Sequence, residues 1–308
     1  MTSSRPLKVG IQLPEVEREV PWPELRLMAE RAEEVGFDSL WVGDHLLYRY
    51  PDGSSRGPWE AWSTLAALAA VTSRVELGPL VACTSFHNPA MLAKKAATVD
   101  EISQGRLVLG LGAGWNETEY SAFGFPFDRR VDRFEEAFTI IRTLLAKGQI
   151  DFEGRYYQAR NCELLPPGPR PGGPPLMIGS TGRRMLAISL PHVQSWNAWY
   201  SSFANDPQEL TQLLRVVDDV CREVGRDPAS VERTVAVMVL LPGAGGRPTL
   251  YHDEETSGRP LSGTPAELAD RLRAFAALGI AHVQLVVDPI TLESIERLAA
   301  TLQALDGG

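Results

Sequence analysis

Strand-like hydrophobic segments recur at a nearly constant interval in the first third of the chain, and this interval constrains the fold. The segments begin at Leu7, Ser39, Val75 and Leu107, which are 32, 36 and 32 residues apart. Each segment is followed by a stretch with the apolar periodicity of a helix. Because an interval of about 30 residues is the length of one strand–helix unit, the sequence predicts that the chain repeats this unit.

The same alternation continues through most of the 308 residues. The expected strands are Leu7–Leu13, Ser39–Gly43, Val75–Ala82, Leu107–Leu109, Leu176–Gly179, Val193–Trp199, Val231–Leu241 and Val283–Val287. The expected helices are Trp22–Val35, Glu60–Val71, Pro89–Ser103, Val131–Ala146, Gly182–Leu190, Asp206–Val224, Pro265–Leu278 and Leu292–Leu305. A doubly wound sheet would alternate in the same way, but eight strand–helix pairs favour a (β/α)₈ TIM barrel, an α/β fold, over residues 1–308 as one domain.

Three stretches depart from the regular pattern. Gly78-Pro79 is expected to interrupt the third strand, because proline cannot donate a backbone hydrogen bond. Residues 149–175 contain a hairpin pattern, IDFEGRYYQ, with its turn at Glu153-Gly154, and a proline-rich run that fits no helix or central strand. Residues 243–262 are polar and rich in glycine and proline. The sequence predicts that 149–175 and 243–262 are insertions at the rim of the barrel.

Charge, hydropathy and cysteine content narrow the function classes. The net charge of −9 is the opposite of the basic face of a nucleic-acid-binding protein. The sequence has no apolar run of membrane-spanning length and no signal-peptide pattern. Cys83, Cys162 and Cys221 are far apart and odd in number, so free thiols are expected. We therefore expect a cytoplasmic protein with a small-molecule partner and no nucleic-acid or membrane partner, and we leave open whether it forms a homo-oligomer.

Arg106–Trp115, RLVLGLGAGW, is the central candidate for a ligand site. A short buried strand leads into Gly110, Gly112 and Gly114, which alternate with larger residues. Glycines allow a flat or anionic ligand to approach the backbone. A Rossmann fingerprint is disfavoured, because Glu117 stands where its third glycine would fall. The remaining alternative is a tightly packed barrel strand that binds no ligand.

Polar and aromatic residues at the ends of several strands should share one face, because barrel enzymes place their chemistry at the carboxyl ends of the strands. These residues are Asp44, His45, Thr84, Ser85, Trp115, Ser180, Trp199 and Tyr200. Function is favoured for Asp44-His45 over a loop cap, whereas His87 is expected to brace the helix that follows it. Trp115 could pack or form the wall of an aromatic cofactor site, and Trp196 is expected to pack.

The sequence contains one candidate phosphate site and no pattern typical of a metal site. Ser180–Arg184, STGRR, could bind a phosphate through its hydroxyls, backbone amides and Arg183, or could simply cap a helix. No metal site is expected, because the first strand has no His-x-His and the five histidines are scattered.

Four segments together resemble the luciferase-like monooxygenase superfamily, and more narrowly its branch that depends on the deazaflavin coenzyme F420. They are Ser39–Leu46 (SLWVGDHL), Leu80–Ala90 (LVACTSFHNPA), Glu101–Trp115 (EISQGRLVLGLGAGW) and Phe123–Glu135 (FGFPFDRRVDRFE). The resemblance covers most of residues 7–240 and implies a (β/α)₈ barrel with a rim insertion, in agreement with the strand count.

The resemblance also implies roles for particular residues. Asp44 and His45 would lie beside the cofactor ring, with His45 as a candidate proton donor. The third-strand bulge would back the ring, with a non-proline cis peptide expected at Leu80–Val81. The implied cofactor-binding residues are Asp44, Leu80, Val81, Ala82, Ala113, Gly114, Trp115, Gly179, Ser180, Thr181, Gly182 and Arg183.

This chain departs from the family pattern at two positions. Sugar-phosphate dehydrogenases of the F420 branch have an acid after the fourth-strand glycines, where this chain has Trp115, so their proton donor is missing. The sixth strand usually begins Ala-Asp-Gly-Trp-Asn, whereas this chain has His192–Asn197 (HVQSWN).

Three functions follow as hypotheses. The leading one is hydride transfer between reduced F420 and a small organic substrate. The alternatives are an FMN-dependent monooxygenase on the same scaffold and a cofactor-binding protein without turnover. The substrate cannot be named from the sequence, because its pocket would be built from the least regular segments.

Overall fold

The central sheet contains nine parallel strands in the order β5-β2-β1-β13-β12-β11-β10-β7-β6. The computed structural model describes residues 5–243 and 259–307. The strands are β1 (Lys8–Gln12), β2 (Ser39–Val42), β5 (Glu76–Pro79), β6 (Ala82–Cys83), β7 (Leu109–Gly112), β10 (Leu176–Gly179), β11 (Ser195–Ala198), β12 (Glu232–Leu240) and β13 (Ile280–Asp288). The first strand pairs with the last, for example Lys8 with His282. That pairing curls the sheet into the predicted barrel and excludes a doubly wound sheet.

Strands β5 and β6 together occupy the third position of the barrel. β5 pairs with β2, β6 pairs with β7, and a bridge between Leu77 and Leu107 closes the gap. The strand breaks at Leu80–Val81. This peptide bond is cis, which confirms the predicted non-proline cis peptide at this position. The predicted interruption at Gly78-Pro79 is wrong, because both residues stay in register with β2 and the Leu80 N–H still donates to Val42 O.

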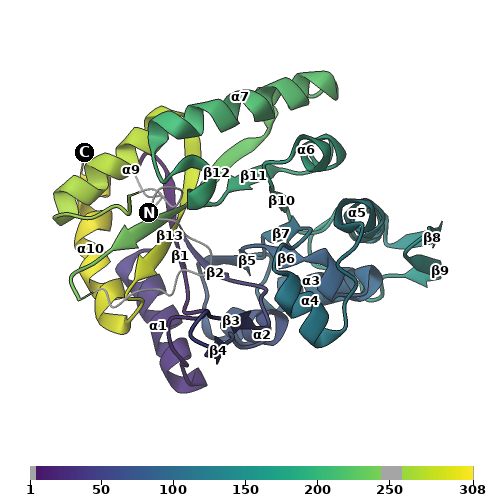
Figure 1. Cartoon of the computed structure of the whole chain (residues 1–308), viewed down its shortest axis with the longest axis horizontal. Coiled ribbons are helices and arrows are strands. Elements are labelled where there is room, and N and C mark those ends of the chain that lie inside the picture. Colours follow the sequence, from purple (N-terminus) through teal and green to yellow (C-terminus); the bar gives the residue numbers. More distant parts are fainter. Residues whose placement is uncertain (1–4, 244–258, 308) are drawn as a thin grey trace.

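The helices cover the outside of the sheet (Figure 1). They are α1 (Trp22–Val35), α2 (Ala61–Val71), α3 (Pro89–Ile102), α4 (Glu117–Phe123), α5 (Arg130–Lys147), α6 (Arg183–Ser189), α7 (Pro207–Glu223), α9 (Pro265–Ala277) and α10 (Leu292–Asp306). Short 3₁₀ turns are η1 (Thr84–Phe86), η2 (Tyr200–Phe203) and η3 (Pro228–Ser230). The expected caps are confirmed: Asn88 accepts backbone N–H groups at the start of α3, and Thr264 forms a capping box with Glu267 at the start of α9.

Two small hairpins lie outside the barrel sheet. β8 (Gln149–Glu153) and β9 (Gln158–Glu163) pair only with each other and extend beyond α5 at the right of Figure 1. The Gly154 N–H donates to Tyr157 O, which confirms the predicted turn. The second hairpin, β3 (Tyr48–Arg49) and β4 (Ser55–Arg56), was not predicted. The second predicted insertion falls mostly on residues 244–258, outside the described residues.

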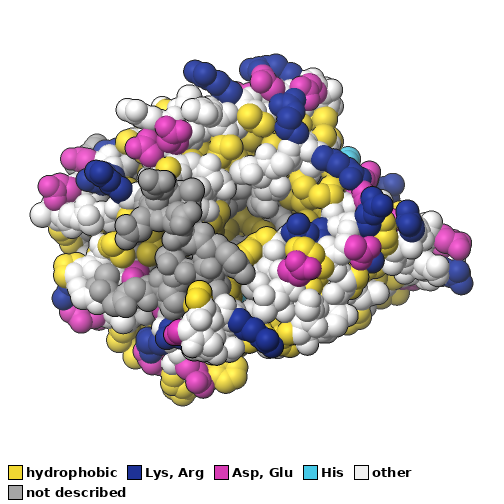
Figure 2. Space-filling view, viewed as in Figure 1, with side chains coloured by type: hydrophobic (Ala, Val, Ile, Leu, Met, Phe, Trp, Pro, Cys, Tyr) yellow, Lys and Arg dark blue, Asp and Glu magenta, His cyan; other side chains and the backbone are white. Residues whose placement is uncertain are grey.

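The described residues also test three expectations from composition. Cys83, Cys162 and Cys221 are free thiols, as predicted. Within residues 5–243 and 259–307, no helix has both the length and the hydropathy needed to cross a bilayer. Figure 2 shows Lys, Arg, Asp and Glu side chains mixed over one face of the molecule, around a hollow bordered by hydrophobic side chains.

Polar side chains form part of the barrel interior. Asn197 on β11 donates to Thr234 Oγ1 and Gln284 Oε1, both at 2.8 Å. Ser39 Oγ lies 2.7 Å from His282 Nε2, and burial lowers the pKa of His282 to about 3. The Asn197 network fixes one side chain of the cavity described below.

Candidate functional site

A cavity of about 720 Å³ opens where the carboxyl ends of the barrel strands meet. Every position of the barrel except β12 and β13 contributes to its lining through a strand end or the segment that follows. The lining residues are Gln12, Glu15, Val16, Asp44, His45, Tyr48, Leu80, Val81, Cys83, Phe86, Gly112, Ala113, Gly114, Trp115, Asn116, Glu119, Arg130, Val131, Gly179, Ser180, Thr181, Met185, Asn197, Ala198, Trp199, Tyr200, Ser201 and Ser202. This is the face on which functional residues of a barrel enzyme lie.

The glycines of β7 and β10 make room for Val81. A Cβ added to Gly112 would lie 2.8 Å from Val81 Cγ2, and one added to Gly179 would lie 2.9 Å from both Val81 methyl groups. A Cβ on Gly110 would lie 2.3 Å from Pro79 O. The alternating glycines therefore let the Leu80–Val81 segment lie against β7 and β10. That segment is the apolar part of the floor, beside Gly112 and Gly179, which also line the cavity.

The turn after β7 requires glycine for a second reason. Gly114 has φ = 72°, and a Cβ there would lie 2.3 Å from Tyr120 Oη and 2.5 Å from Cys83 Sγ.

Burial raises the pKa of the Cys83 thiol to about 12, so this cysteine is a packing group and not a thiolate nucleophile at neutral pH.

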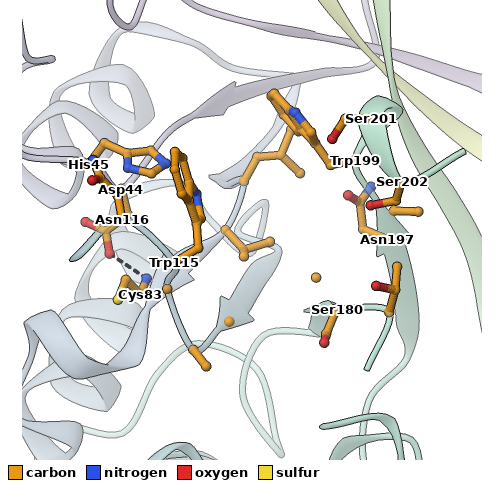
Figure 3. A pocket seen from close by; sticks show the side chains of 18 of the residues that line it. Asp44, His45, Cys83, Trp115, Asn116, Ser180, Asn197, Trp199, Ser201 and Ser202 are labelled. Atoms are coloured by element: carbon orange, nitrogen blue, oxygen red, sulfur yellow. Dashed lines mark hydrogen bonds between the residues drawn. The ribbon is translucent and has the colours of Figure 1, made fainter. Parts of the chain in front are cut away.

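Asp44 is a buried carboxylate that organises the third strand. Its Oδ2 accepts the Cys83 N–H at 2.9 Å (Figure 3). The same oxygen lies 2.9 Å from His87 Nε2. His87, which was expected to brace the helix that follows it, directs this ring nitrogen to Asp44 from the turn before α3. The carboxylate connects the end of β2 to β6 and to the turn before α3.

His45 lies between two buried carboxylates. Its Nδ1 is 2.8 Å from Glu119 Oε1 on α4, and its Nε2 is 3.7 Å from Glu15 Oε1 after β1. The imidazole ring packs on Tyr48 and Trp115, with centroid separations of 4.8 and 5.7 Å. Figure 3 shows His45 and Trp115 together on one wall of the cavity.

The charges around His45 favour its protonated form. Burial alone would lower its pKa, but Glu15, Glu119 and Asp44 outweigh that effect and raise the pKa above the usual value of histidine. His45 is thus an imidazole whose pKa is raised by neighbouring carboxylates while its side chain remains 21% exposed to the cavity.

The opposite wall is polar and aromatic. Asn197, Trp199, Ser201, Ser202 and Ser180 face Trp115 across the cavity in Figure 3. Trp196 lies behind this wall, fully buried, and donates to Ser180 O at 2.7 Å. The prediction that Trp196 is a packing residue is confirmed.

Three residues expected at this face do not line the cavity: Ala82, which was implied as a cofactor contact, and Thr84 and Ser85, which were expected only to share the face. Ala82 is fully buried and pairs with Leu111 on β7. Thr84 and Ser85 are buried behind the cavity wall, where Thr84 donates to Gly112 O. All three belong to the third strand or the turn after it, and only Leu80, Val81, Cys83 and Phe86 from this region line the cavity.

The predicted phosphate loop is divided by the structure. Gly179, Ser180 and Thr181 line the cavity, whereas Gly182 and Arg183 do not. Arg183 is exposed and forms an ion pair with Glu223. Helix α6, which follows, has only seven residues, so its dipole offers a phosphate little.

The cavity also contains residues that the sequence did not single out. They are Gln12, Glu15, Tyr48, Glu119, Arg130 and Asn197. Among the described lining residues, Arg130 is the only Lys or Arg; it donates to Gly114 O and stacks on Phe127. The available sequence signal for Glu119 was its spacing three residues after Asn116 and ahead of Gly124, which marks a short helix. Because buried acids are rare, this spacing alone did not predict that Glu119 is buried.

These residues fit a flat ligand with polar edges. Leu80 and Val81 provide an apolar surface, and aromatic rings form both walls. Gln12 is nine-tenths buried, and its Oε1 has no hydrogen-bond partner among the described residues, so it can accept an N–H or O–H from a ligand. The floor formed by Leu80 and Val81 has no ionisable side chain, whereas Glu15, Asp44 and Arg130 elsewhere in the lining are ionisable.

The fold and the site define a TIM-barrel protein with a ligand pocket at the carboxyl ends of its strands. The sequence profile of the luciferase-like monooxygenase family matches residues 8–242, so the chain belongs to that family.

Its similarity to characterised proteins is uneven along the chain. It is 38% identical over 161 residues to an F420-dependent glucose-6-phosphate dehydrogenase of Amycolatopsis mediterranei, covering 50% of this chain and 46% of that protein. It is 32% identical over 183 residues to a 5,10-methylenetetrahydromethanopterin reductase of Archaeoglobus fulgidus, covering 59% and 50%. The chain thus spans about half the length of these relatives.

The fold extends over the whole chain. An F420-dependent secondary alcohol dehydrogenase, solved in complex with an F420–acetone adduct, superposes with a TM-score of 0.80 over 97% of this chain and 99% of that one, at 21% identity. This likeness supports the barrel assignment.

Proposed function

We propose that the chain is an oxidoreductase that transfers a hydride between reduced F420 and a small organic substrate. The observation that carries the proposal is the His45 site: an imidazole held by Glu119 beside an apolar platform, with a pKa raised by nearby carboxylates, in a chain with a relative named as F420-dependent. Membership of the luciferase-like family supports a flavin-type cofactor in this pocket.

The floor and the two walls would hold the cofactor ring. The ring would rest on Leu80 and Val81, between Trp115 on one side and Asn197 with Trp199 on the other. Gln12 Oε1 would accept a hydrogen bond from the polar edge of the ring. The contacts expected of Ala113 and Gly114 are consistent with their place in the lining.

The cofactor phosphate would lie against Gly179, Ser180 and Thr181, whose backbone and hydroxyls line the same cavity. Arg183 is not offered for this role, because it pairs with Glu223 outside the cavity.

His45 would handle the proton that accompanies the hydride. The bound deazaflavin supplies or accepts the hydride, as the redox group of the reaction. A carbonyl carbon that gains a hydride needs one proton on its oxygen. Since Glu119 occupies Nδ1 of His45, Nε2 is the nitrogen left to give that proton. Asp44 would act through Cys83 and His87, by holding the Leu80–Val81 segment in place.

The alternatives differ in what they require. An FMN monooxygenase must shield a reactive oxygen adduct from water, whereas a deazaflavin reacts sluggishly with oxygen and tolerates an open mouth. Trp115 at this cavity is 49% exposed, which favours the deazaflavin. A binding protein without turnover would not need an imidazole placed between two buried carboxylates at the cavity wall.

The test is anaerobic consumption of reduced F420 with a panel of small ketones, aldehydes and enones. The proposal expects substrate-dependent oxidation of the cofactor. Tight binding of F420 with no turnover on any substrate would favour the binding protein, and turnover only with reduced FMN and oxygen would favour the monooxygenase.

We also propose a cytoplasmic location, on the grounds of the three free cysteines, and no nucleic-acid partner, on the grounds of the acidic composition.

A further inference from the structure

Two buried carboxylates lie beside a single histidine in the cavity. Glu119 is fully buried on α4, and Glu15 is 5% exposed after β1. Burying a carboxylate is costly unless it is paired and hydrogen-bonded. Proton transfer by His45 alone needs neither of them, so their placement requires an explanation.

The contacts of Glu119 hold both of its oxygens. Oε1 lies 2.8 Å from His45 Nδ1 and accepts from Asn116 Nδ2 at 2.6 Å. Oε2 accepts the Leu46 N–H at 3.3 Å. An ionised carboxylate has no proton to give, so the hydrogen between Glu119 and His45 belongs to the imidazole Nδ1.

We propose that Glu119 is the positioning residue of His45: its carboxylate keeps a proton on Nδ1 and leaves Nε2 as the nitrogen that serves the substrate. The inference rests on the proposed function, in which His45 transfers the proton.

The neighbours of His45 agree with this assignment. Asp44 on its own segment and Glu15 and Glu119 on two others face it with negative charge. Tyr48 on β3 packs on the ring and donates its hydroxyl to Glu15 Oε1 at 2.8 Å. Glu15 Oε1 is 3.7 Å from Nε2, beyond hydrogen-bond distance, so Nε2–H stays available to a substrate.

The test uses the full chain without cofactor, labelled with ¹⁵N-histidine. The chain has five histidines, and the His45 resonances are identified by their loss in His45→Asn. In the wild type, the neutral imidazole is expected to carry its hydrogen on Nδ1. Glu119→Gln keeps an acceptor oxygen but removes the charge, so the titration midpoint of His45 should fall by about 1 pH unit or more. Glu117→Gln, on the exposed face of the same helix, is the matched control and should leave the midpoint unchanged.

Either of two results would overturn the proposal: a neutral wild-type imidazole with its hydrogen on Nε2, or an unchanged midpoint in a folded Glu119→Gln. If Glu119→Gln does not fold, the wild-type tautomer decides alone. In turnover with F420, the alkaline fall of kcat should move to lower pH in Glu119→Gln by the same amount, with the Kd for F420 unchanged. A chain that fails to turn over F420 would refute the proposed function, while the spectra would still judge the role of Glu119.

Discussion

The packing of Val81 against the glycines of β7 predicts an energetic coupling between two positions. In Gly112→Ala the new methyl group would lie 2.8 Å from Val81 Cγ2 and 3.5 Å from Gly179 O, so among the described residues Val81 is the only one closer than 3 Å. Overpacking of this kind costs about 1–3 kcal/mol. Val81→Ala removes both methyl groups, so in that background Gly112→Ala should cost about 1–2 kcal/mol less.

Gly110→Ala is the matched comparison. Its methyl group would lie 2.9 Å from Val81 Cγ1 but also 2.3 Å from Pro79 O, a backbone atom that Val81→Ala does not remove. Gly110→Ala should therefore stay destabilising in both backgrounds. The assay is urea denaturation of the single and double variants, followed by circular dichroism. If Gly112→Ala and Val81→Ala were additive, the inference that the glycines exist to receive Val81 would be refuted.

Four further predictions concern the ionisable groups. His45→Ala should lower kcat by about 10²- to 10⁴-fold while the Kd for F420, measured by fluorescence, is retained; wild-type turnover would leave His45 only a structural role. Wild-type kcat should fall as pH rises through the raised pKa of His45, because the protonated form is the donor; a rate that climbs steadily across this range would contradict the assignment. Asp44→Asn should lower the free energy of unfolding by about 1–3 kcal/mol, because a buried hydrogen-bonding group loses its ionised partner; unchanged thermal unfolding would show that the His87 contact is weak. The pKa of His282 is about 3 in the folded chain, so as the pH falls below the pKa of an unfolded histidine only the unfolded chain takes up the proton, and the free energy of unfolding should decrease. His282→Gln should therefore flatten the dependence of the unfolding free energy on pH between 7 and 4. An unaltered slope would show that other groups cause the acid lability.

Long periodic segments made most of the barrel predictable. The expected Trp22–Val35 helix coincides with α1, and Leu176–Gly179 coincides with β10, because apolar spacing and terminal glycines mark their ends. The seven-residue α4 was missed, since a short helix with an acidic first turn has no clear apolar stripe. That omission concealed Glu119.

The site was predictable where it follows from strand ends and less so where it depends on tertiary contacts. Asp44, His45 and Trp115 directly follow strands, and all three line the cavity. Glu15 lies in an irregular segment after β1, where nothing local indicates a buried acid. Arg183 was expected beside Ser180 and Thr181 because it follows them in the chain, but its ion pair with Glu223 is a tertiary contact that local sequence does not indicate.

The central claim is the choice of F420 over FMN, and paired titration tests it most directly. The purified chain is titrated with each cofactor, and oxygen uptake is then followed with the reduced cofactor and a substrate that turns over. The account predicts tighter binding of F420 and substrate-dependent cofactor oxidation without matching oxygen consumption. Tighter binding of FMN with oxygen consumption coupled to substrate would contradict it and assign the chain to the monooxygenases.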